Sequence, residues 1–213
     1  MTRLSYGGHM PKDTFYNLPK NKQERIMEAI IDEFGRHTYE HINLSNIVRD
    51  SKIPRGSFYQ YFLDKDDVFD HLNQEIQKLK YAYFGEIFNP TSEMTFFDRI
   101  EKLLTSSFGF AIKHPKITKI GQKLAESSFY RTHPMALQSI EKANQVFEDW
   151  IKKDVDKGLL RPNIDTHHVA RLCVKLMNQP IYYENINQSS IDQHMQEIKV
   201  LIDLLKKGME NHV

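Results

Sequence analysis

The chain has 213 residues, 40% hydrophobic and 27% charged, enough for one large domain or two small ones with a buried core. Its 29 Lys and Arg residues balance 28 Asp and Glu residues, so any surface for nucleic acid must be a local patch. A single cysteine, Cys173, excludes a disulfide framework within the chain, and no apolar run reaches the ~18 residues of a membrane-spanning helix. We therefore expect a cytoplasmic protein without a membrane partner.

The N-terminal segment, residues 1–19, contains two glycines and two prolines and shows no helical period. This composition predicts a flexible arm. Part of the arm, residues 1–9, could be a leader placed before a natural start at Met10.

From Lys20 onward, apolar residues recur with a helical period, whereas the alternation typical of strands never persists. The sequence therefore predicts an all-α fold of about nine helices. Asp64 is expected to cap a long helix that starts at residue 65, the Asn89-Pro90 pair to end it, and Gly208 to cap the last helix. The expected helices span residues 20–37, 44–51, 54–62, 65–88, 95–113, 115–127, 134–157, 166–184 and 191–207.

The second and third helices have the form of a helix-turn-helix, with a tight turn at Lys52-Ile53. Two short helices that cross steeply can place the second one in the major groove of DNA. Residues 43–62 contain three basic residues and one acidic residue, which gives a local net charge of 3 − 1 = +2 in a nearly neutral chain. The apolar residues expected to hold the two helices together are Ile47, Val48, Ile53, Phe58 and Phe62.

Two stretches of this region resemble the TetR family of transcriptional regulators. Residues 26–34 resemble the pattern of the family's first helix, with Tyr39 at its aromatic position. Residues 53–67 are similar to the family's Val-Ser-x-Gly-Thr-apolar-Tyr-x-x-Phe-x-x-Lys-Glu-Glu run. The residues that fall at the family's spacing in this run are Gly56, Tyr59, Phe62 and Lys65.

The resemblance implies a homodimer in which residues 20–64 form a helix-turn-helix domain that binds a palindromic double-stranded DNA operator. In such a dimer the two recognition helices lie about one DNA turn apart, ~34–36 Å. The resemblance assigns phosphates to Tyr59, Tyr61 and Lys65, backbone contacts to Asn43 and Ser45, and base edges to Arg55, Ser57 and Gln60, with Gly56 in the same surface.

Two positions depart from the family's pattern. Thr38 stands where the family usually has glycine, and Lys52 replaces the glycine of the turn between the two helices. A non-glycine residue at positive φ costs about 1 kcal/mol, so we expect a slightly different turn.

Residues 65–213 are expected to form a larger helical domain for ligand binding and dimerisation, in which the last two helices meet their counterparts in the second subunit. The stripe of Ile198, Leu201, Ile202 and Leu205 needs burial, and a partner helix pair would supply it.

Aromatic and methionine side chains of this domain could line a pocket for a hydrophobic small-molecule effector, although any one such side chain on a helix more often belongs to an ordinary core. The residues expected to bind the effector are Phe97, Phe108, Phe129, Trp150, Met177 and Tyr182.

Catalytic and metal-binding motifs are missing from the sequence. It has no nucleophile elbow and no glycine loop for phosphate, and His167 and His168 are adjacent, so on a helix they cannot chelate one metal ion well. Cys173 is expected to be a buried, inert thiol. We therefore expect neither an enzyme nor a bound metal or cofactor.

The sequence thus predicts a DNA-binding transcriptional regulator, expected to be a repressor released from its operator by a hydrophobic small molecule. The alternative is a helical ligand carrier or protein-interaction module that no longer reads DNA, because the chain is near neutral and Lys52 occupies the turn. DNA affinity that falls steeply with salt would separate the two.

Overall fold

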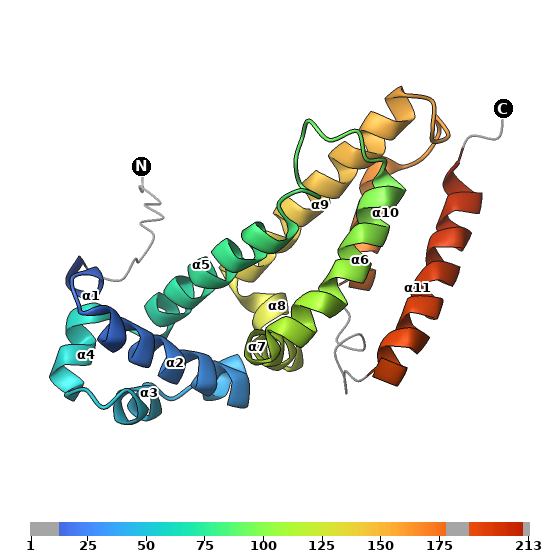
Figure 1. Ribbon diagram of the computed structural model, residues 1–213. Coiled ribbons are helices and arrows are strands. Elements are labelled where there is room, and N and C mark those ends of the chain that lie inside the picture. Colours follow the sequence, from blue (N-terminus) through green and yellow to red (C-terminus); the bar gives the residue numbers. More distant parts are fainter. Residues whose placement is uncertain (1–12, 178–187, 211–213) are drawn as a thin grey trace, which may run out of the picture. The chain divides into compact units, whose positions relative to one another are not determined.

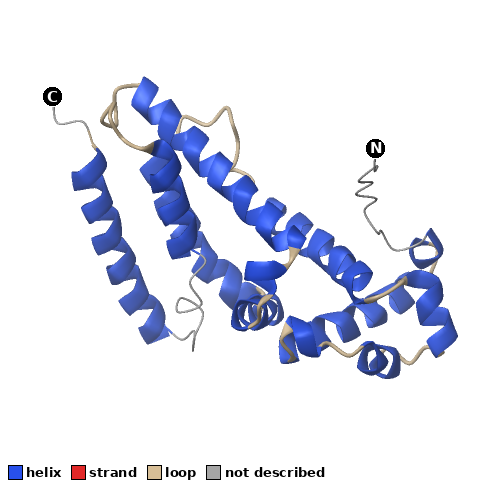
Figure 2. Cartoon of the chain, turned by 180° about the vertical axis from the view of Figure 1, so that it is seen from behind, coloured by secondary structure: helices blue, strands red, loops and turns tan. Residues whose placement is uncertain are grey.

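The computed structural model describes residues 13–177 and 188–210. These residues form eleven α-helices (Figure 1), and Figure 2 shows no strand among them. The all-α prediction is confirmed. The helices are α1 (Asp13–Tyr16), α2 (Lys20–Arg36), α3 (Leu44–Asp50), α4 (Arg55–Tyr61), α5 (Lys65–Phe84), α6 (Phe96–Lys113), α7 (Pro115–Glu126), α8 (Phe129–Thr132), α9 (Pro134–Asp156), α10 (Thr166–Met177) and α11 (Gln188–Met209), with a 3₁₀ turn, η1, at Tyr39–His41.

The helices belong to two compact units. Of the described residues, the first unit contains 13–82 and 119–127, and the second contains 83–118 and those from Ser128 onward. The predicted domain boundary after residue 64 falls inside the first unit. No helix in the described ranges is both long enough and apolar enough to cross a membrane.

The core of the first unit is built on the apolar stripe of α2. Ile26, Ile30 and Phe34 are fully buried there, as their four-residue spacing predicts. Of the five residues expected to join α3 and α4, four are buried and Val48 is half-buried. Burial of each large apolar side chain contributes about 1.5–3 kcal/mol to the free energy of unfolding. These shared buried side chains hold α2, α3 and α4 together in one packed body. The buried four are Ile47, Ile53, Phe58 and Phe62.

Part of the expected flexible arm is a helix, so that prediction is wrong for residues 13–16. Phe15 of α1 is only 2% exposed and packs against Phe62 and His71, with ring centroids 5.3 and 4.9 Å away. A single turn is too short to show a helical period, and this one exists because Phe15 is buried against later parts of the chain.

The long helix α5 begins as expected but ends at Phe84, four residues earlier than predicted. The Asp64 carboxylate accepts the Asp67 backbone N–H (2.9 Å), which confirms the cap. Beyond this end the N–H groups of Ile87, Phe88 and Asn89 bond to the carbonyls three residues earlier, those of Phe84, Gly85 and Glu86. Gly85 is a residue type that weakens helices. The buried Arg99 guanidinium then donates hydrogen bonds to the loop carbonyls of Ile87, Asn89, Ser92 and Met94.

The core of the second unit lies between α6, α9, α10 and α11. The helix α9 packs against α6 and α10, and α11 packs against α6. The start of α6 is fixed by a capping box at Thr95 and by the buried Asp154 carboxylate, which accepts the Phe96 N–H (2.6 Å). Phe96, Phe147 and Ile151 are among the buried side chains of this core.

The C-terminal end of α11 differs from the prediction, because Gly208 lies inside the helix and does not cap it. The carbonyls at this end bond to another segment: Met209 accepts the Arg161 backbone N–H (2.9 Å), and Gly208 accepts from the Arg161 guanidinium. These bonds satisfy the end without a glycine turn. Residues 178–184, expected to continue α10, lie outside the described residues.

Candidate nucleic-acid interface

The N-terminal end of α3 is fixed by two side chains. Asn43 accepts the Ser45 N–H (2.9 Å), as expected of a cap. Glu33 of α2, only 3% exposed, accepts the Asn43 backbone N–H (2.9 Å) and the Asn46 side-chain amide (3.2 Å). This buried carboxylate, which the sequence analysis did not single out, ties α3 to α2 and leaves Asn43 and Ser45 exposed.

The turn between α3 and α4 retains a left-handed residue, although that residue is not glycine. Lys52 has a φ of 52°, and its N–H bonds to the Arg49 carbonyl (3.1 Å). Lys52 therefore adopts the backbone conformation that glycine would favour. Thr38, the other departure, has a φ of −66° and needs no glycine. The Arg25 guanidinium adds a bond to the Ser51 carbonyl (2.7 Å), which the sequence did not reveal.

One face of α4 is open to solvent. Arg55, Gly56, Tyr59 and Gln60 are exposed and Ser57 is half-buried, while Phe58 on the opposite face is fully buried. The Arg55 guanidinium lies 5.9 Å from the centroid of the Tyr59 ring. This face therefore combines the guanidinium of Arg55, the phenol of Tyr59, the amide of Gln60 and a glycine.

Two predicted phosphate contacts lie elsewhere. Tyr61 is only 5% exposed and its hydroxyl accepts from the Lys22 ammonium (3.3 Å), so the prediction of a surface contact is wrong. Its position is fixed by packing against Phe15. Lys65 is half-buried, and its ammonium donates to the Tyr39 carbonyl (3.0 Å) and lies 4.3 Å from the Tyr39 ring centroid. Lys65 thus anchors η1 in this structure.

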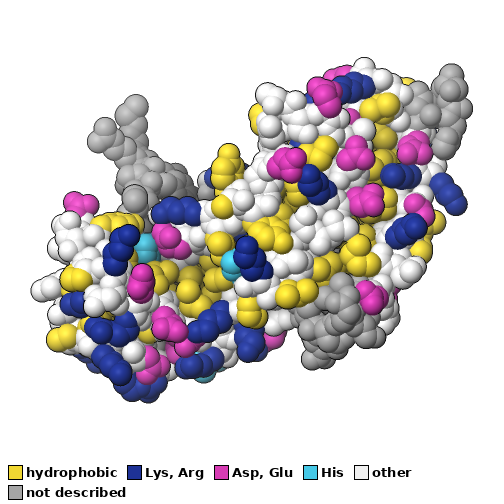
Figure 3. All heavy atoms as spheres, in the orientation of Figure 1, with side chains coloured by type: hydrophobic (Ala, Val, Ile, Leu, Met, Phe, Trp, Pro, Cys, Tyr) yellow, Lys and Arg dark blue, Asp and Glu magenta, His cyan; other side chains and the backbone are white. Residues whose placement is uncertain are grey.

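The helix-turn-helix carries more basic than acidic side chains, and its acidic residue Asp50 is paired. The Arg49 guanidinium lies 2.7 Å from the Asp50 carboxylate, and Arg36 lies 4.0 Å from it. The hydrogen bond from Arg49 lowers the pKa of the Asp50 carboxyl. Lys and Arg side chains gather over this part of the first unit, at the lower left of Figure 3. Near this pair, Lys52 and Arg55 are exposed.

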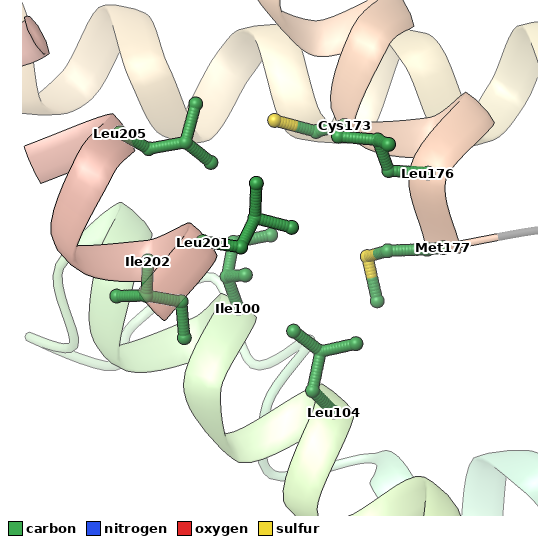
Figure 4. A pocket seen from close by; sticks show the side chains of 8 residues that line it. All are labelled: Ile100, Leu104, Cys173, Leu176, Met177, Leu201, Ile202 and Leu205. Carbon is green, nitrogen blue, oxygen red and sulfur yellow. The ribbon is translucent and has the colours of Figure 1, made fainter. Parts of the chain in front are cut away.

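A small apolar cavity of about 20 Å³ lies in the second unit between α6, α10 and α11 (Figure 4). It has room for about one water molecule. Burial raises the pKa of the Cys173 thiol at its edge to about 11, which keeps the thiol protonated at neutral pH. The lining residues are Ile100, Leu104, Cys173, Leu176, Met177, Leu201, Ile202 and Leu205.

Of the six residues expected to bind an effector, Met177 lines this cavity and four others do not. Phe97 and Phe108 are buried in the core, Phe129 stacks on His133, and Trp150 stacks on Phe147 (centroids 5.1 Å apart). These four side chains pack against other residues of the second unit and do not line this cavity, so their role in effector binding stays a prediction. Tyr182 lies outside the described residues.

The apolar stripe expected at a subunit interface is also placed differently. Ile198 and Ile202 are buried within the chain's own core, and Leu201 and Leu205 line the cavity. Another set of side chains on α10 and α11 is exposed instead. This set, which we call the α10–α11 patch, consists of Leu172, Leu176, Val200 and Leu204.

A helix-turn-helix on a small helical unit, followed by a larger helical unit, defines a class of DNA-binding regulators. Comparison with known structures gives the particular fold. A TetR family transcriptional regulator from Chloroflexus aurantiacus J-10-FL is similar to this chain with a TM-score of 0.73 and 24% identity, over 95% of this chain and 100% of that one. The chain therefore has the fold of TetR-family transcriptional regulators, and the predicted resemblance is confirmed.

Other comparisons give more distant similarities. The TetR-family regulator CifR, as a cysteine mutant in complex with a 26 bp double-strand operator DNA, matches with a TM-score of 0.66 and 10% identity, over 84% of this chain and 94% of that one. The uncharacterized HTH-type transcriptional regulator YhgD of Bacillus subtilis (strain 168) is 22% identical over 140 residues, 65% of this chain and 70% of that protein. No family model matches the sequence.

Proposed function

We propose that the chain is a transcriptional regulator that binds double-stranded DNA through α3 and α4. The observation that carries the proposal is the exposed face of α4, which presents Arg55, Tyr59 and Gln60 from a helix whose other face is buried. Guanidinium, hydroxyl and amide groups are the donors that proteins use on phosphates and base edges. CifR, a regulator of similar fold, forms a complex with double-strand operator DNA, which supports DNA binding as the function.

Gly56 supports the proposal in a different way. A Cβ added at Gly56 would meet no atom within 4 Å, so nothing in the described chain requires a glycine there. Its φ is not in the left-handed range either. A glycine at the exposed start of α4 does allow the backbone to approach a second molecule closely, as DNA binding in a groove would require.

The individual roles follow from exposure. Asn43 and Ser45 would contact the DNA backbone, and Tyr59 would hold a phosphate. Arg55, Ser57 and Gln60 would reach base edges. Lys65 could add a phosphate contact only by giving up its bond to Tyr39.

We further infer a homodimer formed through the α10–α11 patch and a hydrophobic effector bound among the helices of the second unit. The patch supports the dimer because its three leucines and one valine, at helical spacing on two helices, leave apolar surface in water. The effector would release the protein from DNA, as in a repressor. It can do so only through different affinities for the DNA-competent and DNA-incompetent states.

The test is to let the purified protein select sites from a pool of random double-stranded DNA and to measure its affinity for the selected site at several salt concentrations. We expect a near-palindromic site and an affinity that falls steeply with salt, because bound phosphates release counterions. Arg55→Ala should weaken binding about 10-fold, in line with ~1–3 kcal/mol for a base contact. Arg131→Ala, an exposed arginine of α8, is the matched control and should bind like the parent.

Selection of no sequence, together with no salt-dependent binding, would contradict the proposal and favour the ligand carrier. A parent-like affinity in Arg55→Ala, with a palindrome still selected, would show that α4 is not the reading helix.

A further inference from the structure

The short helix α1 precedes α2, α3 and α4 in the first unit and contacts the C-terminal end of α4. Phe15 packs on Tyr61 at the end of α4 and on Phe62 just beyond it, with centroids 6.2 and 5.3 Å away. On its other side it packs on His71 of α5 (4.9 Å). The side chain therefore fills the space between the end of α4 and α5.

A hydrogen bond accompanies this packing. The Thr14 hydroxyl donates to the Gln60 backbone carbonyl (2.8 Å). The last carbonyls of a helix have no partner within the helix, and Gln60 is the penultimate residue of α4. Thr14, 46 residues earlier in the chain, thus donates the hydrogen bond that this carbonyl of the proposed DNA-reading helix lacks within the helix.

The helix that receives these contacts is marginal by itself. α4 has only seven residues, and no side chain caps its N-terminus. Helices this short are unstable in water, so tertiary contacts must hold them. Phe58 holds the middle of α4 from the core, whereas Thr14 and Phe15 hold its C-terminal end.

We propose that α1 is a latch for the recognition helix, with Thr14 and Phe15 as positioning residues for the DNA-reading face. The expected effect on DNA recognition rests on the proposed function, because the end of α4 that α1 holds carries Gln60, which is proposed to reach base edges. Thr14 and Phe15 act through α4 and do not themselves touch DNA. Loss of the latch should let the last turn of α4 fray, and site-specific binding should suffer more than non-specific binding.

The first experiment needs no DNA. Amide hydrogen exchange is measured on the full chain for the Phe62 N–H, which closes the end of α4 on the Phe58 carbonyl (3.0 Å). We expect about 10-fold faster exchange in Phe15→Ala and about 3-fold in Thr14→Val, the range that a lost hydrogen bond of ~0.5–1.5 kcal/mol gives. Thr14→Ser keeps the hydroxyl and should restore the parent rate.

The matched control is Thr132→Val. Thr132 is also exposed and donates its hydroxyl to a backbone carbonyl, that of Ser128 (3.1 Å), on α8 of the other unit. It should leave exchange at Phe62 unchanged. Parent-like exchange at Phe62 in both Phe15→Ala and Thr14→Val would overturn the latch. If Phe15→Ala fails to fold, Thr14→Val and Thr14→Ser still decide the question.

The second experiment measures the ratio of affinities for the selected site and for random DNA of equal length. We expect the ratio to fall about 3-fold in Thr14→Val, to recover in Thr14→Ser and to stay unchanged in Thr132→Val. An unchanged ratio in Thr14→Val, with the parent still selecting a site, would overturn the positioning role. If the parent selects no site, the proposed function fails, and the exchange experiment still decides whether the latch exists.

Discussion

Lys52 shows how a single backbone angle affects this protein. Its φ of 52° places a side chain where glycine is favoured, at a cost of about 1–2 kcal/mol for a non-glycine residue. Lys52→Gly removes this cost but adds freedom to the unfolded chain, so we expect a net gain of about 0.5–1 kcal/mol in the free energy of unfolding. Urea unfolding at neutral pH measures it.

Lys52→Ala provides the control for that gain, because it removes the charge and keeps the Cβ. Alanine should unfold at the parent midpoint or below it. A gain as large in alanine as in glycine would show that charge, and not backbone strain, sets the stability of the turn.

Single residues also mark where sequence reasoning succeeded and failed. The caps at Asn43 and Asp64 depend on neighbours two and three residues away, and both were predictable. Tyr61 was misplaced because its burial depends on Phe15, 46 residues earlier and outside any recognisable pattern. Which face an aromatic side chain presents is decided by such distant contacts.

At the scale of helices, α5 carries a buried histidine whose charge state affects stability. His71 is packed among Phe15, Tyr16 and Phe62, and its Nδ1 has no hydrogen-bond partner among the described residues. Burial lowers the pKa of the imidazole below its ordinary 6.5, although Glu75 and Asp67 oppose the shift and Lys78 adds to it. The folded state therefore holds His71 neutral.

The sign of the pH dependence follows. Above pH 6.5 both states carry neutral His71, so its contribution is constant. As the pH falls below 6.5, the unfolded state takes up a proton that the folded state resists. Stability should fall by up to about 1.4 kcal/mol per pH unit until the folded-state pKa is reached.

Urea unfolding between pH 7.5 and 5 measures this loss, and His71→Leu is the comparison. The leucine variant should lose less stability over the same range, because it lacks the titrating group. Parallel curves for the two proteins would contradict the assignment.

Helices as units were more predictable than their ends. Each of the nine segments predicted to be helical contains a helix, because a 3.6-residue period can be recognised from residues that are close in the sequence. The end of α5 was not local, because Arg99 binds the loop carbonyls from α6. The helices α1 and α8, four residues each, are too short to show a period.

At the scale of the whole molecule, the α10–α11 patch bears on assembly. The sequence predicted that Ile198, Leu201, Ile202 and Leu205 are buried against a second subunit, whereas Ile198 and Ile202 are buried in the chain's own core. Only packing could distinguish that stripe from Val200 and Leu204, which are 59% and 62% exposed. Residues that would line a pocket for the proposed effector are the hardest to predict from the sequence, since core and pocket use the same side chains.

The dimer proposal predicts that Leu204→Glu makes the protein monomeric. In a two-fold interface each substitution occurs twice, and each buried leucine contributes about 1.5–3 kcal/mol, so the dissociation constant of the dimer should rise about 100-fold or more. Sedimentation over a range of protein concentrations measures it. Ile112→Glu, at an equally exposed position of α6 outside the patch, should sediment like the parent.

The same Leu204→Glu monomer should lose affinity for the palindrome and keep weak binding to a half-site, because two linked half-site contacts reinforce each other. A Leu204→Glu protein that remains dimeric would place the subunit interface elsewhere on the chain.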